Sequence, residues 1–222
     1  MKKLIYFLIV IAFVITSCGK KEEATKEKTT PQQSEQSTIQ QKKEDSLKAV
    51  KEQMDREKKV KEALEEEKIL KDPLGQWVVS AEASSTYADH TGKDTWTADQ
   101  MIGAPDVETY GDNGKAWTSK EQSKGVEWVI LNYEKSVNAT EVRVRQSFNP
   151  GAIIKIELID TKGKSHTVWE GLDKTKYEAV SIQYFKTKFD KTDYKTKTVK
   201  ITLATNSVPG WKEIDAVQLL GE

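Results

Sequence analysis

The pattern of apolar and polar positions divides this chain into three parts. Residues 4–15 form an unbroken apolar or aromatic run near the start. A long stretch dominated by Lys, Glu, Gln and Thr follows, and from about residue 76 apolar side chains recur at every second position. Alternation of this kind is typical of β-strands that bury one face.

The third part reads as a series of short strands. Val142 and Val144, for example, alternate with Arg143 and Arg145, and residues 126–131, 154–158, 199–203 and 217–219 repeat the pattern. Turn residues separate these segments at 149–151, 161–164 and 208–210. No helical pattern of usable length occurs between residues 76 and 222. The expected fold is therefore all-β, a sandwich or jelly roll over residues 75–222.

The middle part predicts a flexible leash followed by a charged helix. Residues 18–44 lack aromatic side chains and should form a disordered linker. Over residues 45–72, acidic side chains precede basic ones by four positions, as in Glu52 and Arg56, and Pro73 prevents continuation. Glu57 and Lys61 interrupt an apolar stripe, which argues against a sustained coiled coil. We expect a helical spacer, with a partner-binding or dimerising helix as the alternative.

Composition excludes some classes of function. The chain carries 35 basic and 35 acidic side chains, so no overall field favours nucleic acid as a partner. With one cysteine it cannot form an internal disulfide, and a domain of about 150 residues can bury an adequate core without one. All six tryptophans lie between Trp77 and Trp211, which places the folded domain in the third part.

The N-terminus resembles a bacterial lipoprotein signal. Lys2 and Lys3 precede an apolar run that is shorter than the roughly 20 residues needed to span a bilayer, and Ser17 and Cys18 follow it. The resemblance implies removal of residues 1–17, acylation of Cys18 and export to a membrane through the lipid anchor. Gly19 after the cysteine favours the outer membrane or cell surface. An ordinary secretory signal is the alternative.

Several segments of the third part resemble the discoidin-like, coagulation factor 5/8 type C superfamily, and most of all the scarf domain of pappalysins. The resemblance covers residues 76–222, and its most specific segments are Asn149-Pro150-Gly151-Ala152 and Glu213-Ile214-Asp215-Ala216. It implies a galactose-binding-like jelly-roll β-sandwich. Gln146 stands where relatives often have Glu, and the terminal cysteine pair of many relatives is absent.

Acidic residues near the predicted loops allow two interpretations. Alternation places Glu213 and Asp215 on the same face as Val217 and Leu219. Asp215 then either accepts backbone amides from the turn at residues 149–152 or from another nearby loop, and so locks the sandwich, or it joins a structural calcium site, because calcium prefers oxygen ligands. The candidate calcium ligands are Asp106, Asp112, Asn113, Glu213 and Asp215. No cofactor is expected to be required.

Aromatic and amide side chains in the loops predict a ligand site. Aromatic faces near loop carboxylates and amides are typical of sugar-binding clefts. The candidates are Tyr87, Tyr110, Asn149 and Trp211, whereas Trp96, Trp117 and Trp128 are expected in the core.

No catalytic pattern is evident. His90 and His166 lack the spacing of a zinc site, and no Gly-x-Ser-x-Gly segment occurs. We therefore expect a non-enzymatic, membrane-anchored module of the adhesion type that binds a glycan or a surface protein. The alternatives are an envelope-assembly module without a sugar site and a hydrolase that uses Asp106 and Asp112.

Overall fold

A computed structural model describes residues 31–90, 92–178 and 180–222 of the chain. The predicted signal, Cys18 and the first part of the leash lie outside these ranges. The chain divides into two compact units, one up to Lys58 and one from Lys59 to Glu222.

Helix α1 spans Pro31–Leu70. It ends before Pro73, as expected, but it begins earlier than the expected start at residue 45, so residues 31–44 of the predicted leash are helical. Proline is favoured in the first turn of a helix, and the Gln, Lys and Glu residues that follow Pro31 are good helix formers. Up to Lys58 the helix leaves its apolar side chains in solvent, as for Leu47 and Met54.

Within the described residues, no helix combines the length and the apolar character needed to cross a membrane.

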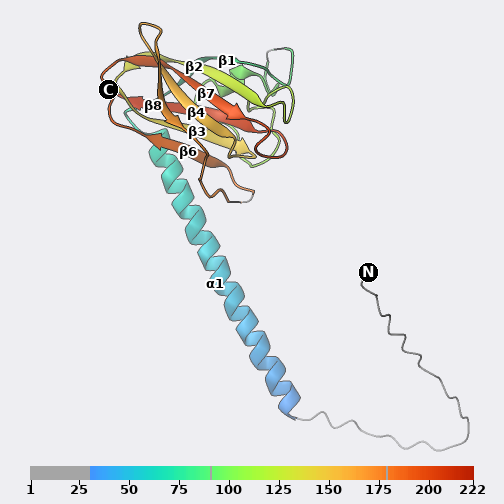
Figure 1. The fold of residues 1–222 in the computed structure, drawn as a ribbon. Helices are drawn as coiled ribbons and strands as arrows, with labels where there is room; N and C mark the ends of the chain where they lie inside the picture. The colour runs from blue at the N-terminus through green and yellow to red at the C-terminus, as the bar shows by residue number, and fades with distance from the viewer. Residues whose placement is uncertain (1–30, 91, 179) are drawn as a thin grey trace, which may run out of the picture. The chain divides into compact units, whose positions relative to one another are not determined.

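The third part of the chain is a β-sandwich, as the alternation predicted. Its strands pair antiparallel throughout, in the order β5-β4-β7-β2-β1-β8-β3-β6 (Figure 1). The bounds are β1 Gly75–Ala83, β2 Val126–Val137, β3 Ala139–Phe148, β4 Ile153–Asp160, β5 Ser165–Glu170, β6 Gln183–Lys188, β7 Thr196–Ala204 and β8 Glu213–Gly221, with a short 3₁₀ helix, η1, at Ala98–Met101.

Strand β1 belongs to both layers of the sandwich. Its first residues, Gly75 to Trp77, pair with β8, and from Val78 to Ala83 the strand pairs with β2, with an irregularity between Val78 and Ser80. Apolar side chains from both layers fill the space between them, among them Leu131, Val144 and Ile201, all fully buried. These are the positions that alternation assigned to the buried face, so the core follows directly from the sequence pattern.

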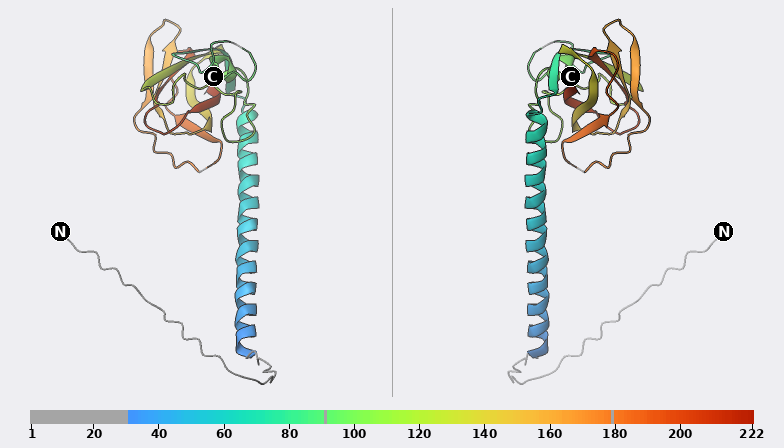
Figure 2. Two further views of the ribbon diagram at one scale, coloured as in Figure 1. Left: turned by 90° about the vertical axis from the view of Figure 1, so that its right-hand side faces the viewer. Right: turned by 90° about the vertical axis from the view of Figure 1, so that its left-hand side faces the viewer.

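The last turns of α1 pack on the outer face of the β8-β3-β6 layer. Ile69 is buried there, and Gln218 of β8 donates from Nε2 to its carbonyl oxygen at 2.9 Å. Arg143 of β3 pairs with Asp72 at 3.0 Å. The β4–β5 hairpin, drawn in orange, lies on the opposite side of the sandwich (Figure 2). Because both of its faces are covered, β8 is buried along its whole length.

A β-bulge interrupts the alternation expected along residues 213–219. Two successive residues of β3, Arg145 and Gln146, pair with residues of β8 that are two positions apart, so Asp215 between them has no partner in the ladder. Asp215 therefore turns to the outer face and meets Arg145. The expectation that it shares the core face with Val217 is wrong, because alternation assumes a strand without an inserted residue.

Candidate functional site

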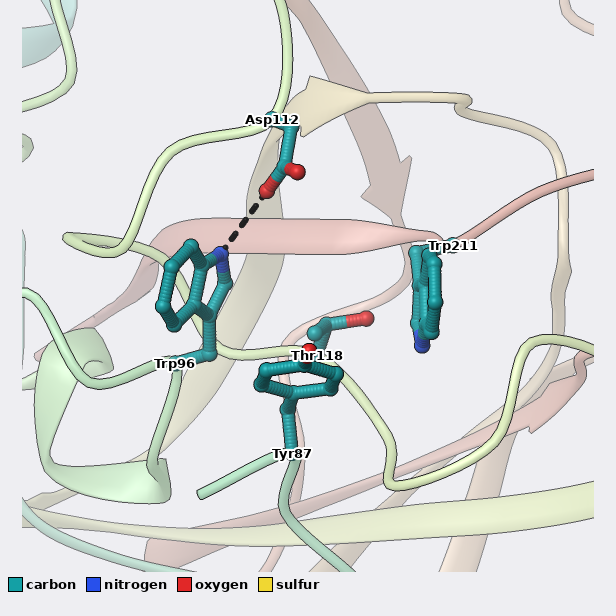
Figure 3. A pocket seen from close by; sticks show the side chains of 5 residues that line it. All are labelled: Tyr87, Trp96, Asp112, Thr118 and Trp211. Carbon is teal, nitrogen blue, oxygen red and sulfur yellow. Dashed lines mark hydrogen bonds between the residues drawn. The ribbon is translucent and has the colours of Figure 1, made fainter.

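A solvent-open hollow of about 300 Å³ lies beside the loops that lead into and out of the strands (Figure 3). Its lining side chains come from the segment after β1, the segment between η1 and β2, and the segment before β8. The lining residues are Tyr87, Trp96, Asp112, Thr118 and Trp211.

Three aromatic rings form most of the wall. The ring of Tyr87 contacts Trp96 with 5.4 Å between centroids and an interplanar angle of 68°, and it contacts Trp211 at 5.6 Å and 88°. Tyr87 thus lies between the two indoles and stands almost perpendicular to Trp211 (Figure 3). Edge-to-face contacts are favourable for aromatic rings, so the three side chains support one another's orientation without a ligand.

Polar atoms complete the hollow. Nε1 of Trp96 donates to Oδ1 of Asp112 at 3.0 Å, and the hydroxyl of Thr118 donates to the carbonyl of Lys212 at 3.0 Å. Nε1 of Trp211 is buried and has no hydrogen-bond partner among the described residues. A buried donor without a partner costs free energy.

Backbone hydrogen bonds hold the loops of the hollow together. Tyr87 donates its amide to the carbonyl of Thr118 at 3.1 Å, and Thr118 donates to Trp96 at 3.3 Å. Trp96 in turn donates to Gly114 at 2.9 Å. A Cβ added to Gly114 would lie 2.6 Å from the Asp94 carbonyl carbon, so the two loops approach closely only because this residue is glycine. The site is preorganised, which lowers the entropy cost of binding.

The two other predicted ligand residues support the Trp211 loop from behind. Asn149 donates from Nδ2 to the carbonyl of Trp211 at 2.8 Å, and the hydroxyl of Tyr110 lies 3.4 Å from Oδ1 of Asn149. Tyr110 also packs against Phe148 at 5.4 Å between centroids. Neither Tyr110 nor Asn149 lines the hollow, so both act on it through Trp211.

A buried carboxyl group lies behind Asp112. Glu213 is 1% exposed and accepts the amide of Asn113 at 3.1 Å and the hydroxyl of Ser147 at 3.4 Å. Burial, and next the nearby Asp112 carboxylate, raise the pKa of Glu213 to about 8. At neutral pH Glu213 is therefore largely protonated.

Asp215 belongs to a separate network. Its carboxylate pairs with Arg145 and accepts the amides of Asp106 at 3.3 Å and Val107 at 3.4 Å. This is the locking role expected from the sequence, with the loop at residues 106–107 in place of the turn at 149–152. Burial raises the pKa of Asp215, and the Arg145 guanidinium opposes that rise.

The candidate calcium ligands divide between these two networks. Asp106 directs its exposed side chain toward Lys115, 3.9 Å away, and Asp112 faces the hollow. Among the described residues, no group of three or more His, Cys, Asp or Glu side chains is arranged to hold a metal ion. Calcium binding stays a prediction. The same separation places the suggested hydrolase residues, Asp106 and Asp112, in different surroundings.

Two of the sequence candidates, Tyr87 and Trp211, line the hollow, and Trp117 is buried in the core as expected. The expectation for Trp96 is wrong, because its indole forms a wall of the hollow. Its φ of 52° puts it in the left-handed region that non-glycine residues rarely adopt, and this conformation is not evident from the residue types. Trp128, the other tryptophan expected in the core, is only half-buried and lies 5.6 Å below the Lys200 ammonium.

Comparison with known proteins gives one family. The family model described as "PAPPA: Pappalysin-1, SD scarf domain, C-terminal" matches residues 66–222. No curated protein matches the chain.

Several solved structures are similar at low identity. Chitosan-binding module 1 from a chitosanase/glucanase of Paenibacillus sp. IK-5 is 14% identical with a TM-score of 0.45, and the match covers 64% of this chain and 94% of that one. The family 32 CBM of C. perfringens NanJ, in complex with galactose, is 19% identical with a TM-score of 0.45 and coverage of 65% and 98%. Allantoicase from Saccharomyces cerevisiae is 14% identical with a TM-score of 0.46 and coverage of 68% and 44%.

Proposed function

The chain belongs to the family of the pappalysin scarf domain, and from the aromatic hollow beside its loops we propose that it is a non-catalytic carbohydrate-binding module. One observation carries this proposal. The rings of Tyr87 and Trp211 stand at 88° to each other in an open, preorganised hollow that also presents the Asp112 carboxylate.

This combination suits a sugar. The C–H face of a pyranose is apolar and can stack on an aromatic ring, while its hydroxyls need hydrogen-bond partners at the edge. Small-ligand sites generally combine an apolar wall with a few placed polar groups. Here the rings supply the wall, and Asp112 supplies acceptors at the rim. Asp112 is exposed, whereas Thr118 is 2% exposed and its hydroxyl is already committed to the Lys212 carbonyl.

A Trp211→Ala substitution tests the proposal. Binding of the full-length chain to a glycan array should identify a ligand, and the variant should bind that ligand at least about tenfold more weakly, because it removes one stacking surface. Trp128→Ala is the matched control, since that side chain lies on β2 outside the hollow and should leave binding unchanged. Equal loss in both variants, or a silent array for the wild-type chain, would contradict a sugar site.

The membrane anchor is a second part of the proposal and rests on the sequence around Cys18. We expect the chain expressed in a bacterium to incorporate a radiolabelled fatty acid and to sediment with membranes. The Cys18→Ala variant should lose the label, because the thiol is the acylated atom. A variant that keeps the label would show that this cysteine is not the attachment point.

A further inference from the structure

The charge of the residues that line the hollow favours one chemical class of sugar over others. Among the described residues that line it, Asp112 is the one with a formal charge, and the others are aromatic or carry a hydroxyl. Oδ1 of Asp112 accepts the Trp96 indole N–H at 3.0 Å, and the Glu213 carboxyl group hydrogen-bonds to the same side chain from behind. These contacts orient the carboxylate, which stays exposed to a ligand in the hollow. The hollow therefore presents a fixed anion at its rim.

Nearby basic side chains do not neutralise this anion. The ammonium of Lys212, in the chain segment that carries Trp211, donates to the carbonyls of Gln122, at 2.8 Å, and Gly210. The ammonium of Lys115 lies against Asp106, where it donates to the carbonyl at 3.4 Å. Glu213 behind the rim accepts an amide and a hydroxyl and pairs with no cation among the described residues.

The aromatic wall adds to the same preference. The face of an aromatic ring carries partial negative charge and attracts a cation within about 6 Å of its centroid. Tyr87 lies 5.4 Å from Trp96 and 5.6 Å from Trp211, so a group bound in this corner contacts more than one ring. Rings together with a carboxylate favour a cationic group, whereas a carboxylated or sulfated sugar would be repelled.

We propose that the ligand of this hollow is an amino sugar, whose protonated amine binds between the Asp112 carboxylate and the aromatic rings while its ring stacks on Trp211 or Tyr87. The inference rests on the proposed carbohydrate-binding function and specifies the chemical class of the sugar. N-acetylation would remove the charge and add bulk at the same atom, so an acetylated sugar should bind less well.

Three oligosaccharides that differ in one substituent test the inference. Isothermal titration of the full-length chain is carried out with β-1,4-linked tetramers of glucosamine, N-acetylglucosamine and glucose. We expect the glucosamine tetramer to bind at least about tenfold more tightly than the other two. Raising the salt concentration should weaken binding of the glucosamine tetramer alone, because charge attraction at an exposed rim is screened.

An isosteric variant of Asp112 tests whether the charge of this side chain, and not its shape, determines binding. Asp112→Asn keeps an oxygen to accept the Trp96 N–H but removes the negative charge. The affinity of this variant for the glucosamine tetramer should therefore fall to its affinity for the glucose tetramer. Asp106→Asn is the matched control, because that carboxylate is exposed outside the hollow and should leave all three affinities unchanged. Near-ultraviolet circular dichroism checks that both variants keep the packing of their aromatic residues.

The outcomes distinguish this inference from the function on which it rests. If all three tetramers bind with equal affinity, or if Asp112→Asn binds the glucosamine tetramer as well as the wild type, the cation preference is wrong and carbohydrate binding stands. If the array identifies a neutral or acidic glycan and the glucosamine tetramer fails to bind, the inference is again wrong. If neither the tetramers nor the array gives binding, both proposals fail.

Discussion

Replacing Arg145 with methionine should lower the free energy of unfolding of the sandwich by roughly 3 to 5 kcal/mol, the usual cost of leaving a buried charge without its partner. The side chain of Asp215 is 1% exposed and that of Arg145 is 11% exposed. Arg145 also donates to the carbonyl of Val107 at 2.7 Å and pairs with Glu66 at 3.3 Å. Its loss therefore affects the bulge, the adjoining loop and the last turns of α1 together.

Chemical denaturation followed by tryptophan fluorescence measures this effect, because all the tryptophans lie in the sandwich. Asp215→Asn in the Arg145→Met background should recover part of the loss, since a neutral amide can still accept the amides of the 106–107 loop without a buried charge. Arg56→Met, on the exposed part of α1, is the control and should change stability by less than about 0.5 kcal/mol. A loss of similar size in the single and double variants would show that the ion pair is not the cause.

The sandwich should also become less stable as pH rises from about 4.5 to about 8, because of Glu213. Its folded-state pKa of about 8 lies above the ordinary value of 4.5. Between these values the folded state binds more protons than the unfolded state, so deprotonation of Glu213 favours unfolding. The contribution is fully present below the unfolded pKa and is lost as pH passes the folded pKa. The stability lost when Glu213 deprotonates is at most about 5 kcal/mol.

Thermal unfolding of Glu213→Gln over the same pH range isolates this contribution. Glutamine resembles the protonated acid, because it can accept the Asn113 amide and donate toward Asp112. We expect the variant to match the wild type near pH 5 and to be more stable near pH 9. Glu134→Gln, at an exposed position of β2, is the control and should keep the pH dependence of stability of the wild type. If the melting temperatures of wild type and Glu213→Gln change in parallel with pH, the raised pKa of Glu213 is contradicted.

The strands were predictable because each one buries a single face against the other layer. Val142 and Val144 point into the core, and Arg143 and Arg145 point out, as their alternation predicted. Alternation does not predict side-chain direction where a strand is covered on both faces. Strand β8 is covered on both faces and contains a bulge, so the alternation of residue types no longer reports direction at Asp215.

The site was predictable only in part. The sequence predicts Tyr87 and Trp211 because they lie in loops, where an aromatic side chain has no strand face to fill. The same argument predicts Tyr110, and Asn149 is predicted as a loop amide near the aromatic residues, but both support the Trp211 loop from outside the hollow. The sequence does not indicate that Trp96 and Asp112 line the same hollow, because their meeting depends on two loops whose close approach requires glycine at position 114.

By itself the sequence determined the all-β class and the position of the core, because periodicity records which side of a strand avoids water. It also predicted the helix that precedes the sandwich, because acidic side chains there precede basic ones by four positions. Only the tertiary structure decided which loop residues form one hollow and which carboxyl group is neutral. Those properties depend on contacts such as Trp96 with Asp112 and Glu213 with Asn113, which join residues 16 and 100 positions apart and leave no periodic signal along the chain.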